Sequence, residues 1–444
     1  MFNAKIVLWK RKSALLLFLL LQIILIFAPG CGPEPTAIYI ILPTKTASPT
    51  AIPPPTETQL PTPTPALTLT PFVPRAVIKV FSQSPLSGDQ AIGGSDILHG
   101  AELAVQQLDG PLREQGFKIQ LLPYDDQNSA EIAAANAQEI VADPEILCGI
   151  GHYDSLITIE ISDIYHQAGL AFVAPSATTP LLTDRSYLEI NRVIGRTDGQ
   201  GTAAAQFAKA QGFTSVYIVS QKGASSLRNA EYFRTESGSL GIKWLGSVIS
   251  SLPAENMNKF VSQIMNARPD LVYISSSADQ AIPFLTELRA AGYMGTFLGT
   301  ESLDNQSMIS AAGPSLVEGG GIYYTIASPP AQYYSDAAKF VQDFNTQYGA
   351  APRSFAARAY DATGICLKAI EEASKAKGDI PPTRAEVAKA IRALKDYKGI
   401  TGTYNFNNHG DPDPVQYYIY QVVSTDDASW DQNPIVAAYG VTPP

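Results

Sequence analysis

Cysteine and histidine are scarce in this sequence of 444 residues. There are three Cys, at positions 31, 148 and 366, and four His, at positions 99, 152, 166 and 409. So few Cys exclude a dense disulfide framework, and no Cys or His pair has the short spacing of a metal site. We therefore expect no metal and no other cofactor.

Charge is also limited, since charged residues make up 16% of the chain and the formal net charge is −10 at pH 7. Beyond the N-terminus the sequence has no block of basic residues. Binding to nucleic acid requires clustered Lys and Arg, so we expect no nucleic-acid partner. The 45% of hydrophobic residues are enough for two domains with ordinary cores.

The sequence signatures of common enzymes are missing as well. Gly223-Ala224-Ser225 lacks the closing Gly of a nucleophile elbow, and no G-K-[ST] phosphate loop occurs. We therefore expect no catalytic residues and no enzyme activity. A hydrolase on an α/β scaffold is the alternative in this class, and turnover of a bound compound would favour it.

The N-terminal 31 residues resemble a lipoprotein signal peptide. A basic start precedes an apolar run over 14–27, which is shorter than the roughly 20 residues of a spanning helix. Ala28-Pro29-Gly30-Cys31 then resembles a lipobox, although Ala28 replaces the usual Leu and Pro29 is uncommon there. This predicts lipidation at Cys31; an uncleaved N-terminal anchor is the alternative.

Residues 32–75 are dominated by Pro and Thr. Pro fixes φ and removes backbone donors, so the composition predicts an extended, semi-rigid tether rather than a packed element. A signal, a lipid and a spacer together predict a globular part held at the outer face of the cell membrane.

From Ala76 onward, strand-like and helix-like segments alternate, which favours parallel sheets covered on both faces. The predicted strands of a first block are 77–82, 119–123, 146–150 and 170–174, and those of a second block are 215–219, 243–247, 271–275, 296–298 and 322–327. Two α/β blocks with no long linker favour two lobes that face each other across a cleft. Near the end of the chain we expect antiparallel strands around 402–406 and 415–423, joined by the turn HGDPDP.

Two polar turns follow neighbouring apolar runs of the first block, His152–Ser155 after 146–150 and Pro175–Thr179 after 170–174. Ligands of open α/β sheets bind just beyond the carboxyl ends of strands. Small residues such as Ser and Thr at these turns provide hydroxyl and free backbone N–H groups, and they leave space for a ligand. Because neither turn contains a nucleophile with a base, they predict a binding site rather than a catalytic one.

From about residue 76 to 425 the chain resembles the branched-chain (Leu/Ile/Val-type) amino-acid-binding proteins of ABC importers, a group of type I periplasmic binding proteins. The order and spacing of several stretches support this resemblance: SPLSG and LHGAELAVQQL, YDDQNSAEIAAANAQEIV, IGHYDS, APSATTPLLTDR, RVIGRTDGQGTAAAQF, GTESLDN and FAARAYDA. The resemblance implies two Rossmann-like lobes with parallel sheets, joined by a three-segment hinge. Lobe 1 would span 76–196 and 328–400, and lobe 2 would span 197–327 and 401–444, with crossings near 196–198, 326–328 and 401–402.

The resemblance also implies where a ligand binds. Ser155, Ser176, Ala177 and Thr178 would hold the α-carboxylate and α-ammonium of an amino acid, and Glu301 from lobe 2 would cap the ammonium. Charge-assisted hydrogen bonds of this kind contribute roughly 1.5–3 kcal/mol each when water is excluded. The alternatives are that these hydroxyls only cap helices and that Glu301 is a solvated loop carboxylate.

Three further pocket positions that are commonly aromatic in the family correspond here to Ile92, Ser225 and Ser277. Two Ser in place of bulky rings predict a wider or more polar pocket at the side-chain end of the ligand. Tyr153, next to the first turn, would line the cleft or pack on the sheet.

Cys148 and Cys366 lie in apolar segments that the resemblance assigns to lobe 1, which predicts two buried thiols. A disulfide between them is the alternative in an exported protein.

The function we expect is that of an extracytoplasmic, lipid-anchored solute-binding protein. It would be a monomer that captures an amino acid, branched-chain or related, and presents it to an ABC permease in the membrane. The runner-up is a ligand-sensing receptor module of the same fold for an amide or a small carboxylate.

Overall fold

The computed structural model describes residues 72–250, 256–305, 307–308, 313, 317–426 and 432–443. The signal peptide, Cys31 and nearly all of the tether lie outside the described residues and stay predictions. In this part of the chain, no helix combines the length and the hydropathy needed to cross a bilayer.

Lobe 1 is built on a sheet of five parallel strands in the order β2-β1-β3-β4-β5. The strands are β1 (Ala76–Ser84), β2 (Phe117–Asp125), β3 (Ile146–Gly151), β4 (Ala171–Ala174) and β5 (Ile190–Arg192). The sequence did not predict β5, because three residues are too short to show a period of two; its pairing with β4 defines it.

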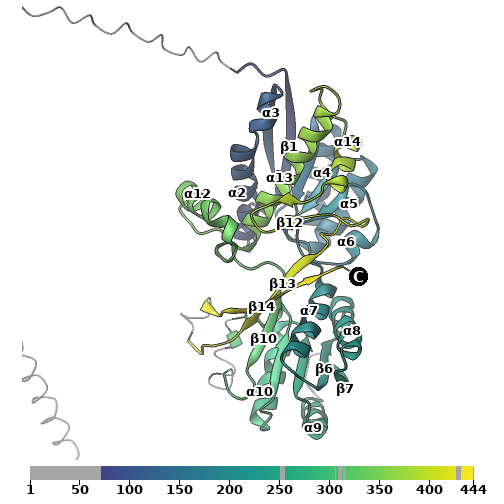
Figure 1. Cartoon of the computed structure of the whole chain (residues 1–444), viewed down its shortest axis with the longest axis vertical. Helices are drawn as coiled ribbons and strands as arrows, with labels where there is room; N and C mark the ends of the chain where they lie inside the picture. The colour runs from purple at the N-terminus through teal and green to yellow at the C-terminus, as the bar shows by residue number, and fades with distance from the viewer. Residues whose placement is uncertain are drawn as a thin grey trace, which may run out of the picture. The chain divides into compact units, whose positions relative to one another are not determined.

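Helices cover both faces of this sheet (Figure 1). One face carries α2 (Ala91–Leu108), α3 (Gly110–Glu114), α13 (Ser354–Lys375) and α14 (Arg384–Ala393), and the other carries α4 (Ala130–Ala142) and α5 (Ser155–Gln167). The short helix α6 (Leu181–Asp184) follows β4, and α12 (Ala338–Tyr348) packs against α2. The inner strands β3 and β4 are buried on both sides and consist of apolar residues and Gly, whereas the edge strand β2 begins with alternating buried and exposed residues.

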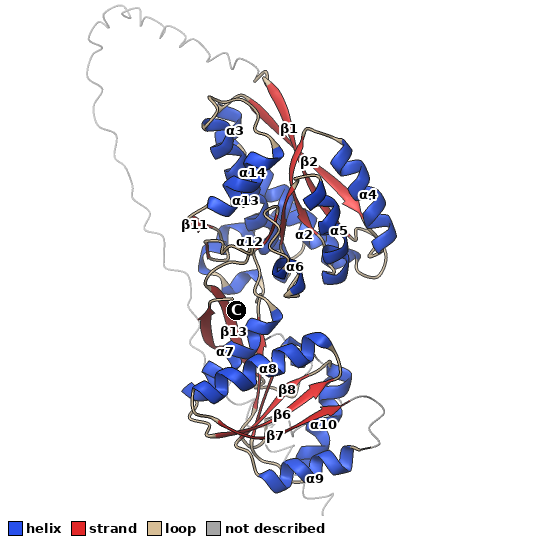
Figure 2. Cartoon of the chain, turned by 90° about the vertical axis from the view of Figure 1, so that its right-hand side faces the viewer, coloured by secondary structure: helices blue, strands red, loops and turns tan. Residues whose placement is uncertain are grey.

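Lobe 2 repeats this plan and adds two antiparallel strands. Its parallel strands are β6 (Ser215–Gln221), β7 (Lys243–Ser250), β8 (Leu271–Ser275), β9 (Thr296–Gly299) and β10 (Ile322–Ile326), followed across the sheet by β13 (Val415–Gln421) and β14 (Ile435–Val441). Helices α7 (Thr197–Ala210) and α8 (Ala224–Ser239) cover one face, and α9 (Met257–Ala267) and α10 (Ala278–Ala290) cover the other (Figure 2). The parallel strands have the order β7-β6-β8-β9-β10, which matches β2-β1-β3-β4-β5 of lobe 1.

The C-terminal segment departs from the sequence-based expectation. Strand β12 (Thr403–Tyr404) pairs with β11 (Tyr397–Lys398), whereas β13 pairs with β10 and β14, so the two expected antiparallel strands do not pair with each other. Tyr404 and Phe406 are buried in the core of lobe 1. Residues 401–406, which we expected in lobe 2, therefore pack with lobe 1, and the third crossing lies between Phe406 and Val415.

One buried side chain from α13 contacts two of the three crossings between the lobes and a residue shortly before the third. The Arg358 guanidinium donates to the carbonyls of Val193 (2.5 Å) and Ala327 (3.1 Å), which lie in the first and second crossings. It also donates to the hydroxyl of Tyr404 (3.1 Å), shortly before the third. Lobe 1 thereby fixes the paths of the segments that lead to and from lobe 2.

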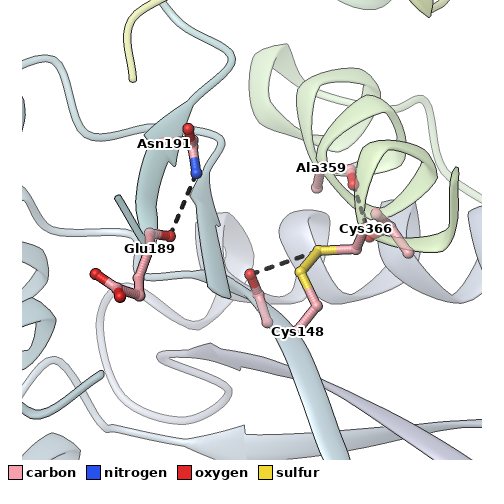
Figure 3. Close-up of a disulfide and its surroundings, with 7 residues drawn as sticks. Cys148, Glu189, Asn191, Ala359 and Cys366 are labelled. Carbon is pink, nitrogen blue, oxygen red and sulfur yellow. Dashed lines mark hydrogen bonds between the residues drawn. A yellow bond between two sulfur atoms is a disulfide. The ribbon is translucent and has the colours of Figure 1, made fainter. Parts of the chain in front are cut away.

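Cys148 of β3 and Cys366 of α13 form a disulfide inside lobe 1 (Figure 3). Both residues are buried, as we predicted, but the prediction of free thiols was wrong. Helix α13 packs directly on β3, which brings the two Cα atoms to 5.9 Å, within the usual range for a disulfide. That packing is a tertiary contact between residues 218 positions apart, and no local pattern indicates it.

Candidate functional site

The two polar turns of lobe 1 lie side by side at the carboxyl ends of β3 and β4. The Ser176 hydroxyl donates to the carbonyls of His152 (2.5 Å) and Tyr153 (3.1 Å), so it joins one turn to the other. Ser176 is 6% exposed and its hydroxyl proton is already used. Its main role in this structure is therefore to hold the two turns together.

A buried polar network supports the first turn from below. His152 is fully buried, and its Nδ1 lies 2.8 Å from the Asp126 carboxylate at the end of β2. The Tyr165 hydroxyl donates to the Gln83 side chain at 2.8 Å. The rings of His152 and Tyr165 stack at 6.3 Å. The sequence did not reveal this network, because its members come from three different strands or their ends and one helix.

Ser155 begins α5 and is partly exposed. Asp154 caps the helix by accepting from the N–H groups of Leu156 (2.7 Å) and Ile157 (3.2 Å). The Ser155 hydroxyl makes no hydrogen bond to any residue that the structure describes. A free hydroxyl at the positive end of a helix dipole suits a carboxylate guest.

In the second turn, Thr178 is accessible to a ligand and Ala177 is not. Thr178 is partly exposed, and its carbonyl accepts from Thr197 N (2.8 Å), at the start of α7. Its hydroxyl has no hydrogen-bond partner within the described parts of the chain. Ala177 is completely buried, and its carbonyl accepts from Arg192 at 2.7 Å. Ala177 therefore supports the turn, and Thr178 is the residue that faces outward.

An aromatic pair borders this end of lobe 1. The Tyr153 ring meets the Phe355 ring edge to face, with centroids 5.8 Å apart. It also lies against Gly93 so closely that a side chain there would collide with it. Ile92, the next residue, is 61% exposed. Tyr153 therefore both packs on lobe 1 and borders the site, and Phe355 is a neighbour that we did not predict.

On lobe 2, Glu301 lies in η1 (Glu301–Leu303), directly after β9. Its Oε2 atom is buried and has no hydrogen-bond partner in the part of the chain that the structure describes. Burial raises the pKa of Glu301, and the nearby Gln200 amide acts in the opposite direction. Gln200, in the first turns of α7, is fully buried, yet neither polar atom of its side chain has a partner with good geometry. Sequence reasoning missed Gln200, although it stands within the stretch RTDGQG.

The two other predicted residues of lobe 2 stand at the starts of helices. The Ser277 N–H and hydroxyl both donate to the Gln221 side-chain oxygen at 2.9 Å, so Ser277 is fixed to the end of β6. Ser225, near the start of α8, is exposed. Because β6, β8 and β9 are neighbours in the sheet, Ser225, Ser277 and Glu301 all follow adjacent strand ends.

The lobes also meet through an ion pair beside the site. Arg228 of α8 lies 2.9 Å from the Asp184 carboxylate of α6, and Arg196 lies 3.0 Å from the same carboxylate. The Arg228 pair is partly exposed, so its contribution to stability is small, about 0–1 kcal/mol. The pair nevertheless links α6 of lobe 1 to α8 of lobe 2.

These features supply binding chemistry. Lobe 1 contributes free hydroxyls and a helix N-terminus, and lobe 2 contributes a buried carboxylate. Among the residues that the structure describes, no group of three His, Cys, Asp or Glu could hold a metal ion. The two lobes of this α/β fold thus both carry polar groups at the carboxyl ends of their parallel strands, where ligands of such folds commonly bind.

The chain belongs to the periplasmic binding protein family, whose model matches residues 78–428. It is 25% identical over 342 residues to a Leu/Ile/Val-binding protein homolog of Brucella melitensis, which covers 76% of this chain and 88% of that protein. It is 26% identical over 349 residues to a leucine-, isoleucine-, valine-, threonine- and alanine-binding protein of Pseudomonas aeruginosa, covering 78% of this chain and 89% of the relative.

A solved structure supports the fold independently. An ABC transporter substrate-binding protein of Desulfitobacterium hafniense, in complex with Leu, superimposes with a TM-score of 0.64 at 24% identity, covering 79% of this chain and 98% of that one. At this identity the likeness establishes the fold alone. The family and the two-lobed fold class predicted from the sequence motifs are thereby confirmed.

Proposed function

We propose that this protein is the solute-binding component of an ABC importer and that it captures an amino acid in the cleft between its lobes. The observation that carries the proposal is the Glu301 carboxylate, whose buried Oε2 atom has no hydrogen-bond partner among the residues that the structure describes. A buried carboxylate without a partner costs free energy unless a cation meets it. The α-ammonium group of an amino acid is such a cation.

Lobe 1 would supply the contacts to the other end of the amino acid, its α-carboxylate. The hydroxyls of Ser155 and Thr178 and the N-terminus of α5 would hold the α-carboxylate, with Ser176 and Ala177 fixing the turn that presents them. A ligand held at both ends binds the closed state better than the open one and so shifts the population toward closure. The names of the two relatives support amino acids as the ligand class.

The side-chain end of the ligand should be polar or wide. Ser225 and Ser277 stand where rings are common in the family, so an apolar side chain would lose ring contacts on lobe 2. The proposal therefore covers branched-chain and related amino acids. Lipidation at Cys31, which would hold the protein beside its permease, is an expectation from the sequence.

A thermal-shift screen of the natural amino acids tests the proposal. At saturation a true ligand raises the melting temperature, because it binds the folded state alone. For the best ligand we expect Glu301→Ala to weaken calorimetric affinity at least tenfold, since one charge-assisted interaction is worth roughly 1.5–3 kcal/mol. Glu287→Ala, which removes an exposed carboxylate from α10 of the same lobe, is the matched control.

The same ligand without its ammonium group should bind Glu301→Ala and the unchanged protein equally. Unchanged amino-acid affinity in Glu301→Ala would refute the zwitterion arrangement. If only amides or small carboxylates shift the melting temperature, the receptor-module alternative replaces this one.

A further inference from the structure

Asn229, in α8, is completely buried and uses both polar atoms of its side chain. Its Nδ2 donates to the Thr197 carbonyl at 2.7 Å, and its Oδ1 accepts from the Tyr273 hydroxyl at 2.5 Å. Because a carbonyl can only accept, Thr197 fixes which end of the amide faces it, and the Tyr273 hydroxyl must then be a donor. Asn229 therefore joins β8 to the first residue of α7 in one defined orientation.

A glycine allows the two helices to come close enough for this contact. A Cβ atom on Gly201 of α7 would lie 2.5 Å from the Asn229 carbonyl oxygen and 2.8 Å from Phe233 N, so a larger residue would push α8 away. The Phe233 ring in turn stacks on Tyr273 with centroids 3.7 Å apart, which holds the phenol in place. The stretch RTDGQG, which contains Gly201, thus has a packing role at the start of α7.

Thr197 continues the same path into lobe 1. Its N–H and its hydroxyl both donate to the Thr178 carbonyl, at 2.8 Å and 3.2 Å. Thr178 belongs to the second polar turn, and its own hydroxyl is one of the proposed contacts to the ligand carboxylate. A chain of hydrogen bonds thus leads from Tyr273, through the buried amide and Thr197, to Thr178. It connects the core of lobe 2 to the binding turn of lobe 1 along the first crossing.

The lobe 2 end of this chain lies near the proposed partner of the ammonium group. Glu301 directly follows β9, the strand that pairs with β8. Burial raises the pKa of the Tyr273 hydroxyl, and the negative charge of Glu301 raises it further. The phenol therefore keeps its proton at neutral pH and remains a donor to Asn229. The chain accordingly ends beside the two groups that would hold opposite ends of an amino acid.

We propose that Asn229 is a positioning residue of the amino-acid site and sets the carboxylate-binding turn of lobe 1 relative to the acid of lobe 2. This inference rests on the proposed function, since it concerns the same site. Because Asn229 is fully buried, it would act through Thr197 and Tyr273 and not by touching the ligand. Neighbouring hydrogen bonds in a buried chain strengthen one another, so loss of the central amide should loosen both ends.

Two variants and a matched control test this role in the full chain. Asn229→Ala removes both bonds without adding volume, and Tyr273→Phe removes only one hydroxyl. Tyr293→Phe is the control, because its buried hydroxyl donates to the carbonyls of Pro269 and Thr296, at the amino ends of β8 and β9. The probe is L-leucine or, where another natural amino acid gives a larger thermal shift, that amino acid.

We expect calorimetric affinity to fall at least tenfold in Asn229→Ala and at least threefold in Tyr273→Phe, and to stay within twofold in Tyr293→Phe. In the double variant, Tyr273→Phe should cause no further loss, because the chain is already broken at Asn229. A merely structural role would lower the melting temperature of all three single variants and leave the affinity of the folded protein unchanged.

Hydrogen exchange of the ligand-free protein supplies a second measurement. The Thr197 amide should exchange at least tenfold faster in Asn229→Ala than in the unchanged protein, and at the same rate in Tyr293→Phe. Unchanged affinity in Asn229→Ala, or reduced affinity with unchanged exchange at Thr197, overturns the positioning role and leaves the proposed function standing. If no natural amino acid binds the unchanged protein, the proposed function fails and the positioning role fails with it.

Discussion

At the scale of single residues, two sets of buried polar groups contrast in this protein. Arg358 and Asp361 are buried but well paired, since Asp361 accepts from Ile400 N (2.7 Å) and Thr401 N (2.8 Å), and the Arg358 guanidinium has carbonyl and hydroxyl partners. Gln200 is buried and Glu301 is partly buried, and both have buried side-chain atoms without a hydrogen-bond partner among the described residues. The first group holds the crossings together, and the second stands where a ligand is expected, because natural folds rarely leave such groups unsatisfied without a function.

Glu301→Gln should therefore stabilise the ligand-free protein while weakening amino-acid binding. Burial raises the pKa of Glu301 above 4.5 in the folded state, so the ionised carboxylate disfavours folding. At pH 7 without ligand, we expect the variant to melt about 2 °C higher than the unchanged protein. At saturating ligand, scanning calorimetry should show the unchanged protein melting at the higher temperature.

The pH dependence of this effect has a definite sign. Below the unfolded pKa of 4.5 the carboxyl group is protonated in both states and the variant should gain nothing. As the pH rises from 4.5 through the higher pKa of the folded state, the ionised Glu301 carboxylate should destabilise the unchanged protein to its full extent. Ligand affinity should change in the same window, falling on acidification as the carboxylate that meets the ammonium is lost. An affinity that is constant from pH 7 to pH 4 would contradict this role.

At the scale of elements, each proposed ligand contact is placed by a strand end. The turns after β3 and β4 of lobe 1 and those after β6, β8 and β9 of lobe 2 hold the proposed amino-acid site, and the two sheets share one strand order. Parallel strands bring their carboxyl ends to one edge, so residues far apart in sequence become neighbours. The precision of the first turn then depends on how firmly β3 is held.

The disulfide between Cys148 and Cys366 is a covalent restraint that holds β3 against α13. Replacing both Cys148 and Cys366 by Ser removes a cross-link over 218 positions. The lost restriction of the unfolded chain should lower the free energy of unfolding by about 5 kcal/mol. For a protein of this size we expect a melting temperature about 5 °C lower. Scanning calorimetry with and without reductant measures it, because reductant should lower the melting temperature of the unchanged protein and not that of the variant.

Both Cys lie in lobe 1, so the disulfide does not restrain the hinge. Amino-acid affinity should therefore change less than threefold in the double variant. A large loss of affinity with an unchanged melting temperature would show that the disulfide acts on the site and not on stability.

At the scale of the whole molecule, coupling between the lobes depends on a few buried side chains. Arg358 donates to carbonyls of two of the crossings and to the hydroxyl of Tyr404, shortly before the third. Asp411, within the third crossing, pairs with Arg192 at the end of β5 (2.8 Å) and with Arg196 of the first crossing (3.3 Å). Loss of one partner from such a buried set leaves other groups unsatisfied, which typically costs 3–5 kcal/mol.

Arg358→Met should consequently lower the melting temperature by several degrees and separate the unfolding of the two lobes into two calorimetric transitions. Arg228→Met, which removes a partly exposed pair between the lobes, is the control and should shift the melting temperature by less than 1 °C. Equal effects of the two substitutions would show that the crossings do not depend on Arg358.

The sequence by itself determined the repeating α/β pattern, the family and the two turns after β3 and β4, because these depend on local periodicity and on short motifs. The family resemblance also indicated Glu301 on lobe 2, whose role in binding stays a prediction. The sequence predicted the strands of the two large sheets apart from β5 and β14, and it did not predict β11 of the two-stranded sheet β11-β12. Of these, β5 and β11 are too short to show a period.

Only the tertiary structure decided how these parts combine. The placement of 401–406 in lobe 1, the disulfide and the contacts of Arg358 all join segments that are distant in the chain. Which hydroxyls are already used, as in Ser176, and which are free, as in Ser155, depends on neighbours that only the folded chain supplies. Local propensity has no access to such contacts, since they form when packing brings separate elements together.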